Sequence, residues 1–538
     1  MLQLFKTTLK SAVIVAQHKK FASYTRVCRA RNYSTQTDPT CARVSKGLVI
    51  GLYEKCDSGD PFTLSTIGRQ INEHCHGQLT EAIQTFGLSG VVGQFATFNN
   101  IYPDYSTICV VGLGPSGQGL NTAESIVEPL ENVRIAAGRG FKALEEQGCT
   151  HIYLDSMNHP EQAAEGASLA SFKFQMNKIQ SEKKPVPKLE LFDQSDIEAW
   201  TCGMIKAEAQ NRSRYMCEVP ACQMTPIDFA DATVDMLDPC GVTVNVRNME
   251  WLESMQFGAM LAVAKTSCEP PVFLEIFYRG GHSDQKPVCL IGEGLTFNSG
   301  GLSIKSTKEL EKTGKCSMSG AATVVSVIRA ASILGLPINV VGLVPLCENM
   351  PSGMAFKPRD IVRCANGLTL AISDPRNAGV LLLADSMVHA NKTYKPKFIM
   401  TLSTSTCHIE NVLGGAAAGV FCNQSCLWEE IQKAGQITGD RVWQLPFWKY
   451  YNRQVVDHHN ANISNEGMGR GRSCINAAFL TNFNKQTDFA HLDLGGNGFA
   501  VNNNLIGYLE KNRMSGRPTR TILQLLCQVA GNRTEKSE

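Results

Sequence analysis

The chain has 538 residues, of which 43% are hydrophobic and 19% are charged, a globular balance long enough for two domains. The formal net charge of +2 gives no basis for binding to nucleic acid or to an anionic surface. The 20 cysteines are scattered through apolar segments, as at Cys109, Cys289 and Cys347, so we expect mostly free thiols rather than a disulfide scaffold.

The first 33 residues differ in charge from the rest of the chain. They carry seven cations and no acid, and the first acid is Asp38. Apolar residues recur at helical spacing with Ser and Thr between them, which is typical of a mitochondrial transit peptide. The longest apolar run, SAVIVA, is too short for a membrane span. We therefore predict a transit peptide over 1–33 with cleavage after Tyr33; a basic tail without a role in import is the alternative.

Strand and helix patterns alternate along the rest of the chain. Strands are predicted at 107–114, 151–156, 242–248, 272–278, 288–297, 338–346 and 398–404, and helices at 132–148, 197–216, 249–267, 321–335 and after the turn at 373–379. The Pro-punctuated, charged stretch 181–196 marks a boundary. We predict an α/β fold in two domains, 34–190 and 191–538, each with a mainly parallel or mixed sheet flanked by helices on both faces.

Several local motifs do not indicate a cofactor or metal. GLGPSG (112–117) follows a strand, but the next helical pattern begins well downstream, which favours a plain glycine-rich turn over a dinucleotide site. The pairs Cys217/Cys222 and Cys422/Cys426 lack a second ligand pair at zinc spacing. The runs His74–His76 and Asp457–His459 place adjacent side chains in different directions, which favours ordinary surface positions.

Four segments of the second half carry a specific resemblance. They are GEGLTFNSGGLSIK (292–305), SMSGAA (317–322), NVVGLVPLCENMPSGMAFKPRDIVRCANG (339–367) and AISDPRNAGVLLLAD (371–385). In this order they closely resemble the leucyl aminopeptidase family of two-metal exopeptidases, and the match extends over about 205–500. The leader and the altered motifs further resemble the insect sperm leucyl aminopeptidase subgroup. The resemblance implies a macro-like N-terminal domain, a peptidase-like C-terminal domain and a hexamer.

The family's reaction uses two divalent ions, zinc, manganese or magnesium, which polarise the scissile carbonyl and generate hydroxide. The family pattern GKGITFDSGG supplies a metal Lys and a metal Asp, and this sequence has Glu293 and Asn298 there. Lys305 is retained at the position of the family Lys that contacts the substrate carbonyl. Ser317 stands where DMGGAA supplies a bridging Asp.

The family pattern NTDAEGRL supplies an Asp, a Glu and the catalytic Arg. An ungapped match from 366–367 to 383–385 places Arg376, Ala378 and Val380 at these three positions. A shifted register would keep Asp374 as the metal Asp, but it needs two gaps and still loses the Glu and the Arg.

Charge decides what these substitutions imply. Glu293 is the only acid left at the matched positions, whereas Lys305 and Arg376 are cationic, so the site carries about +1 before any metal arrives. A guanidinium a few ångströms from a divalent ion repels it by several kcal/mol at an effective dielectric near 20. Asn and Ser are weak neutral ligands, and Ala and Val are none. We therefore expect no metal cofactor.

Two cations at the matched positions need a role. Lys305 could be a surviving catalytic group, but without the ions a structural ion pair is favoured. Arg376 could bind an anion, or could fill the vacated metal space and pair with Glu293 in a charge swap, which we favour.

The sequence leaves three functions open. The first is a catalytically inactive, structural member of the family in sperm mitochondria, forming hexamers and possible higher lattices. The second is a working metal aminopeptidase with relocated ligands. The third is a regulatory or peptide-binding subunit that mixes with active paralogues.

Overall fold

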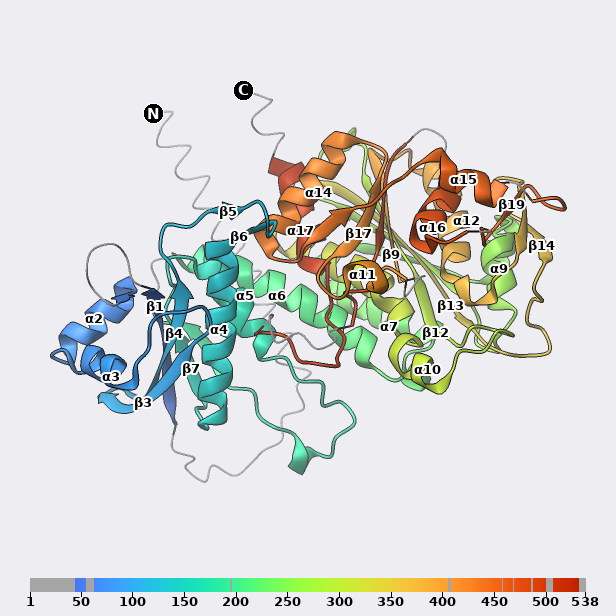
Figure 1. Ribbon diagram of the computed structural model, residues 1–538. Helices are drawn as coiled ribbons and strands as arrows, with labels where there is room; N and C mark the ends of the chain where they lie inside the picture. The colour runs from blue at the N-terminus through green and yellow to red at the C-terminus, as the bar shows by residue number, and fades with distance from the viewer. Residues whose placement is uncertain are drawn as a thin grey trace, which may run out of the picture. The chain divides into compact units, whose positions relative to one another are not determined.

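The computed structural model describes residues 44–54, 62–193, 196–404, 408–456, 458–467, 469–484, 487–499 and 507–531. The predicted transit peptide lies outside these residues. Contacts group Ser45–Glu538 into one compact unit. The compact unit contains two large sheets, the first built from strands between residues 46 and 191 and the second from strands between residues 243 and 493 (Figure 1).

The first sheet has the strand order β3-β4-β1-β7-β8, and β2 pairs with β1. β1 pairs in parallel with β4 and β7, and β7 with β8, whereas β3 and β2 are antiparallel to their neighbours. The strands are β1 (Lys46–Glu54), β2 (Phe62–Leu64), β3 (Phe95–Tyr102), β4 (Tyr105–Gly114), β7 (His151–Leu154) and β8 (Lys188–Leu191).

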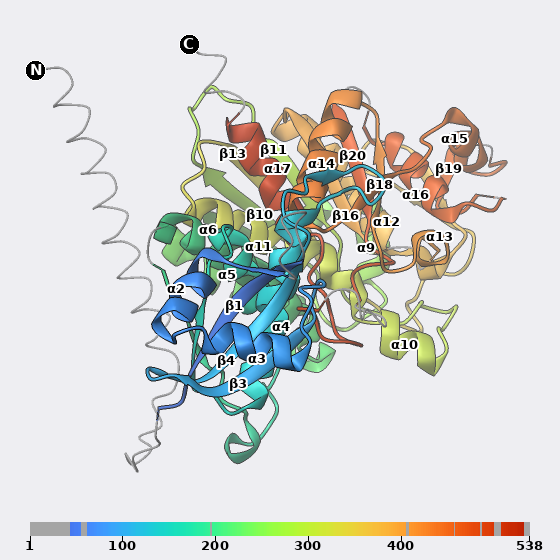
Figure 2. The same cartoon turned by 60° about the vertical axis from the view of Figure 1, so that its left-hand side comes forward.

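Helices cover both faces of this sheet (Figure 2). On one face lie α2 (Thr66–His74) and α3 (Gln78–Phe86). On the other lie α4 (Glu128–Glu146) and α5 (Pro160–Ala170). Because α4 begins at Glu128, the glycines of 112–117 do not open a helix. A two-stranded ribbon, β5 (Leu120–Asn121) and β6 (Ile126–Val127), fills the intervening loop.

The second sheet has the order β18-β17-β20-β16-β11-β13-β10-β9, with β12 also pairing with β13. Its centre, from β13 through β11 and β16 to β20, is parallel, and antiparallel pairs flank it. The strands are β9 (Thr243–Arg247), β10 (Val272–Arg279), β11 (Val288–Gly292), β12 (Gly294–Asn298), β13 (Asn339–Asn349), β16 (Phe398–Ser403), β17 (Ala418–Cys422), β18 (Val442–Gln444) and β20 (Asp488–Asp493).

Two hydrophobic layers sandwich the second sheet, as the sequence predicts. One layer contains α6 (Ile197–Glu218), α7 (Pro226–Leu237), α11 (Ser319–Ile333), α14 (Ser425–Thr438) and α17 (Thr519–Gly531). The other contains α8 (Met249–Ser254), α9 (Gly258–Ala264), α12 (Gly379–Thr393), α15 (Lys449–Val456) and α16 (Arg472–Thr481). Smaller elements are α10 (Thr307–Thr313), α13 (Glu410–Leu413) and the sheet of β14 (Asp360–Arg363), β15 (Thr369–Ile372) and β19 (Ile463–Ser464).

One stretch of the described chain, Thr307–Ile333, has the length and hydropathy of a membrane span. Most of it is buried inside the protein: α11 is covered on all sides by strands and helices of the second sheet's layer. Its apolar sequence is therefore accounted for by core packing.

Two elements that were predicted as continuous are each divided in the structure. The helix expected over 249–267 is two helices, because Gln256 adopts φ 57° between them and Phe257 turns into the core. The strand expected over 288–297 breaks at Glu293, where β11 ends and β12 begins. At this break the Glu293 N–H donates to the carbonyl of Leu402 in β16, and the Glu293 carbonyl accepts from the N–H of Ala321 in α11. These two hydrogen bonds hold the backbone of Glu293 between β16 and α11.

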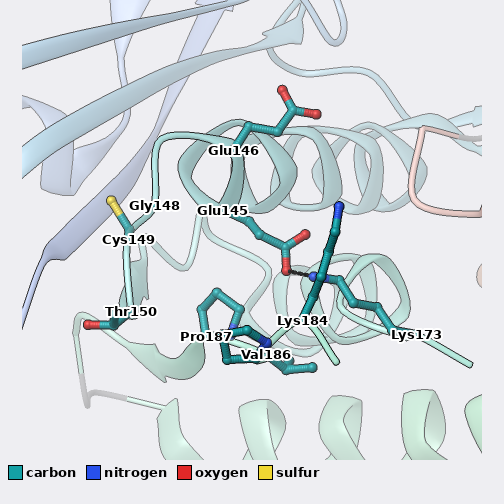
Figure 3. Close-up of a pocket in the computed structure, with 10 residues that line it drawn as sticks. Glu145, Glu146, Gly148, Cys149, Thr150, Lys173, Lys184, Val186 and Pro187 are labelled. Atoms are coloured by element: carbon teal, nitrogen blue, oxygen red, sulfur yellow. Dashed lines mark hydrogen bonds and ion pairs between the residues drawn. The ribbon is translucent and has the colours of Figure 1, made fainter. Parts of the chain in front are cut away.

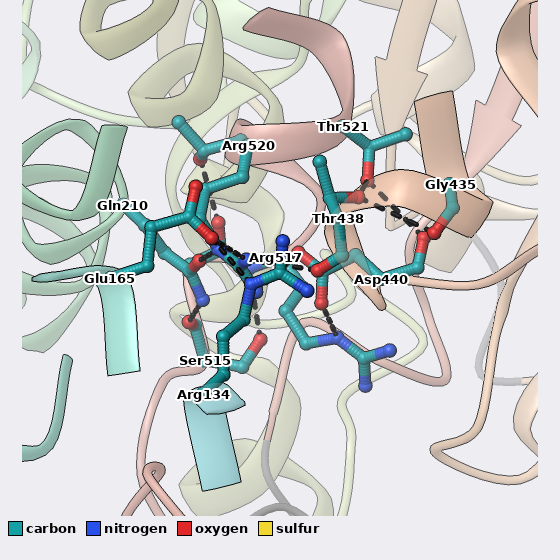
Figure 4. A network of polar contacts seen from close by, with 12 residues as sticks. Arg134, Glu165, Gln210, Gly435, Thr438, Asp440, Ser515, Arg517, Arg520 and Thr521 are labelled. Carbon is teal, nitrogen blue, oxygen red and sulfur yellow. Dashed lines mark hydrogen bonds and ion pairs between the residues drawn. The ribbon is translucent and has the colours of Figure 1, made fainter. Parts of the chain in front are cut away.

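A buried network of charges joins helices from both halves of the sequence (Figure 4). The Glu165 carboxylate of α5 accepts from Arg134 of α4 at 2.5 Å and from Arg520 of α17 at 2.9 Å. Asp440 pairs with Arg517 at 2.5 Å. All five side chains are at most 2% exposed. Each charge therefore depends on its partners for the solvation that water does not supply.

We predict that Glu165→Gln destabilises the protein by about 3–5 kcal/mol, because it leaves two buried guanidinium groups short of one negative charge. Urea unfolding followed by circular dichroism measures the change. Glu124→Gln is the matched control: it removes an ion pair that also joins distant segments, Glu124–Arg441 at 2.7 Å, but Glu124 is 61% exposed. The control should cost less than about 1 kcal/mol. Equal effects of the two substitutions would contradict the prediction.

Candidate functional site

The positions matched to the family motifs gather at one edge of the second sheet. β13, β11, β16 and β20 are parallel, so their carboxyl ends meet at this edge. Glu293 follows β11, Asn298 ends β12, and Ser403 ends β16. The helices α11 and α12 begin at the same edge, after Ser317 and Ala378. Carboxyl ends of parallel strands are where open α/β sheets place their ligand sites.

Glu293 is the most enclosed charged group of this edge, with 0% exposure. Its Oε2 accepts a hydrogen bond from the Thr404 N–H at 2.8 Å, while Oε1 has no hydrogen-bond partner among the described residues. The carboxylate lies against Gly379: a Cβ there would come within 2.1 Å of Oε1. The first turn of α12 thus requires glycine because the Glu293 side chain fills the space beside it.

Burial sets the charge state of this carboxyl. Desolvation raises the pKa of Glu293 to about 7. The Thr404 N–H, the Ser403 and Ser317 hydroxyls and the Lys305 ammonium lower it only in part. A carboxyl with this pKa is protonated for much of its time near neutral pH, and a protonated carboxyl is a poor ligand for a hard cation.

The oxygen of Asn298 is already committed to the protein. Its Oδ1 accepts from the Gly300 N–H at 3.1 Å and from Asn349 Nδ2 at 2.9 Å. Its own Nδ2 donates to the Arg376 carbonyl at 3.3 Å. Two accepted bonds occupy both lone pairs of an amide oxygen, so none is left for a metal ion.

Three further altered positions, Ser317, Ala378 and Val380, are neutral and buried. Ser317 lies in the turn Cys316–Met318 and is 4% exposed. Ala378 and Val380 are both 0% exposed, and Val380 belongs to the hydrophobic layer under the sheet. Where the family resemblance implies a metal Glu and a catalytic Arg, this chain has core packing.

The proposed pairing of Arg376 with Glu293 is wrong. The Arg376 guanidinium donates to the carbonyls of Ser303 and Ile304, at 2.9 and 3.3 Å, and lies 3.8 Å from the Glu309 carboxylate. Its side chain is 47% exposed, whereas Glu293 is fully buried. The guanidinium reaches water and backbone carbonyls by turning outward, which costs less than entering a dry site.

Lys305 lies between the buried Glu293 carboxyl and the half-exposed Arg376 side chain. Its Cγ and that of Arg376 both lie 3.3 Å from where a Cβ of Gly300 would be, so the two cations pack over the same glycine. Gly300 and Gly301 have φ values of 92° and 60°, which explains why the family's double glycine is kept. The Lys305 ammonium also acts on the Glu293 carboxyl by lowering its pKa in part.

Asparagines that sequence reasoning missed hold the turn at 373–379. Asn465 Oδ1 accepts from the N–H groups of Ser373 and Asp374, and Asn377 Nδ2 donates to Asn476 Oδ1 at 2.8 Å. The sequence near residue 465 contains no motif that predicts this role. The polar turn at 373–379 indicated only that its backbone groups need hydrogen-bond partners. The carboxylate of Asp374 pairs with Arg472 at 2.8 Å, so the alternative register gives no free ligand either.

These residues do not fit the two divalent ions that the resemblance implies. Within the described ranges, no group of three or more His, Cys, Asp or Glu side chains is placed to hold a metal ion, and this includes His74–His76. Asp457 of the run Asp457–His459 lies outside the described residues. At the site itself one carboxyl of raised pKa, one saturated amide and one hydroxyl remain.

A surface pocket lies elsewhere, in the N-terminal part of the chain (Figure 3). Its wall contains the ion pair of Lys173 and Glu145, at 2.5 Å, and the residue Cys149. None of the family positions lines it, so the pocket is not the counterpart of the family's active site.

Family models match nearly all of the folded chain. The N-terminal domain of the cytosol aminopeptidase family matches residues 49–181, and the catalytic domain of the same family matches residues 211–523. The chain belongs to the leucyl (cytosol) aminopeptidase family.

Characterised relatives agree with this assignment. Cytosol aminopeptidase of Sus scrofa is 38% identical over 496 residues, covering 91% of this chain and 94% of its own length. The Homo sapiens cytosol aminopeptidase is also 38% identical, with 91% and 94% covered. Among solved structures, the bottromycin maturation enzyme BotP in complex with Mn superposes with a TM-score of 0.77 at 24% identity, over 90% of this chain and 100% of its own. A tomato leucine aminopeptidase mutant gives 0.76 at 23%, over 92% and 95%.

The raised pKa of Glu293 predicts a pH-dependent effect of Glu293→Gln. Because the folded pKa of about 7 lies above the ordinary 4.5, the protonated carboxyl stabilises the fold below about pH 4.5, and this stability is lost as pH rises through 7. The amide cannot ionise. The variant should be more stable than the natural chain by about 3 kcal/mol at pH 8, and by less than about 1 kcal/mol at pH 5.

Urea unfolding at both pH values measures this difference. Glu311→Gln, at an exposed position of α10, is the control and should change stability equally little at pH 5 and pH 8. A Glu293→Gln variant that is less stable than the natural chain at pH 8 would show that the ionised carboxylate is needed.

Proposed function

We propose that this chain is a catalytically inactive member of the leucyl aminopeptidase family that serves as a structural protein. One observation carries the proposal: the family's metal positions hold a buried carboxyl of raised pKa, a hydrogen-bond-saturated amide and neutral core side chains. The frame of the site is kept, with its double glycine, its helix starts and its strand ends.

Lys305 does not restore the reaction. In a two-metal mechanism the ions supply both the polarised carbonyl and the hydroxide. The amine of Lys305 supplies neither, and its neighbour Arg376 donates to the carbonyls of Ser303 and Ile304. Both cations act on the loop that contains the double glycine, which supports a structural role for them.

The remaining parts of the proposal come from the resemblance and the leader. We propose that the mature chain is a subunit of a mitochondrial hexamer, of the sperm type in the subgroup it resembles. The basic, acid-free start of the sequence supports the mitochondrial address. The full-length family match supports the assembly, because both family domains are present.

We predict that the purified mature chain binds no stoichiometric metal and does not hydrolyse leucinamide. Elemental mass spectrometry after incubation with manganese or zinc should find far less than one ion per chain. Turnover should stay at the buffer rate, because among the residues that the structure describes no cluster of His, Cys, Asp or Glu is placed to hold the ions. The pig cytosol aminopeptidase, assayed in the same buffers, is the positive control.

Two metals per chain together with turnover would establish the alternative, a working aminopeptidase with relocated ligands. If the chain binds metal but does not hydrolyse leucinamide, the claim that the matched positions bind no metal is wrong, whereas the claim that the chain is inactive stands.

A further prediction concerns the endogenous protein. Its N-terminus should be Ser34 after import into isolated mitochondria, and native mass spectrometry should show particles of six chains. An uncleaved chain on the mitochondrial surface would contradict the transit peptide. Particles that contain active paralogues would favour a regulatory subunit over a structural one.

A further inference from the structure

Two cysteines far apart in the sequence lie on helices that pack together in one register. Cys202 is on α6 and Cys527 is on α17, and both are free thiols of intermediate exposure. Neither belongs to the family positions described above.

Side-chain hydrogen bonds fix the register of the two helices. Gln210 Oε1 of α6 accepts from Arg520 of α17 at 2.6 Å, and one turn earlier on α6 Lys206 donates to Gln524 at 2.9 Å. From the first contact to the second, the residue number falls from 210 to 206 on α6 and rises from 520 to 524 on α17, so the two helices run antiparallel. Each contact is four residues from the last on both helices, which is one helical turn. One further turn brings residue 202 level with residue 528, so Cys202 lies at the level of the adjacent Cys527 on α17.

The charges around the thiols agree with this placement. Burial raises the pKa of the Cys202 thiol to about 11, the Lys206 ammonium lowers it in part, and the neighbouring Cys527 raises it. Burial likewise raises the pKa of Cys527, and Lys206 lowers it in part. The 4% exposed Lys206, held by Glu161 at 2.6 Å, therefore acts on both thiols.

We propose that Cys202 and Cys527 form a disulfide that ties α17 to α6 under oxidising conditions. The co-reactant is a low-molecular-weight disulfide such as glutathione disulfide. One protein thiol loses its proton and attacks a sulfur of this molecule, forming a mixed disulfide and releasing one thiolate. The second protein thiolate then attacks the protein sulfur and releases the other. The protein loses two protons and two electrons, and glutathione disulfide takes up both electrons.

Other thiols are less suited to this exchange. Cys149 adds to the raised pKa of Cys109, but the two are 3% and 0% exposed, out of reach of a dissolved oxidant. Cys426 is exposed at the start of α14, but Cys422, at the end of β17, is buried and its thiol donates to the Gln424 carbonyl. Thiols of high pKa are poor leaving groups, so a bond between Cys202 and Cys527 forms slowly and resists reduction once made.

The test uses the full mature chain equilibrated with glutathione disulfide. Remaining thiols are blocked with N-ethylmaleimide, and a tryptic digest is mapped without reduction. The expected product is the Cys202 peptide joined to the Cys527 peptide, two hydrogen atoms lighter than their sum and lost on reduction. The thermal midpoint of the oxidised protein should rise by several degrees, because the bond closes a long loop.

Cys202→Ser and Cys527→Ser should each abolish this rise, whereas Cys426→Ser, at an exposed position on α14, should keep it. The proposal is overturned if both cysteines of the natural chain are blocked separately or carry only glutathione. It is also overturned if the rise survives in Cys202→Ser. The peptide map of the natural chain decides the question even if a variant does not fold.

Discussion

The charge network around Glu165 is the constraint on which the arrangement of helices depends. It joins α4 and α5, which cover the first sheet, to α17, the last helix of the described chain. Ions enclosed to this degree cannot exchange a partner for water without a large cost. Arg520 also donates to Gln210 of α6, so the network also sets the register in which α6 meets α17. The order of these helices follows from charge pairing as much as from apolar packing.

The matched positions keep the backbone of the family site while their side chains differ. Gly292 and Gly379 allow strand ends and helix starts to approach closely. Where the resemblance implies carboxylates, this chain has Asn298, Ser317, Arg376 and Ala378, and Glu293, at the position of the family Lys, is buried where the neutral form is favoured. Packing and hydrogen bonding between protein groups have taken the place of ligand bonds.

The sequence predicted the alternation of strands and helices, the sandwiched parallel sheet and the family, because periodicity and motif order are local properties of the chain. It failed where long-range contacts decide. The break of the strand at Glu293 depends on Leu402 and Ala321. Arg376 was assigned to Glu293 by charge alone, whereas the structure offers it backbone carbonyls and water. The hydrogen bonds of Asn465 to a turn some 90 residues away had no local signature.

The neutral lining of the former metal site has a consequence for how the chain folds. A site of several carboxylates repels itself until ions arrive, so its folding free energy depends on the metal supply. Here Asn298, Ser317 and Ala378 carry no charge and Glu293 can hold a proton. The chain can therefore complete its second sheet in a compartment poor in divalent ions, and chelators should leave its stability unchanged. A site with this side-chain content makes the folding of the second sheet independent of the metal supply.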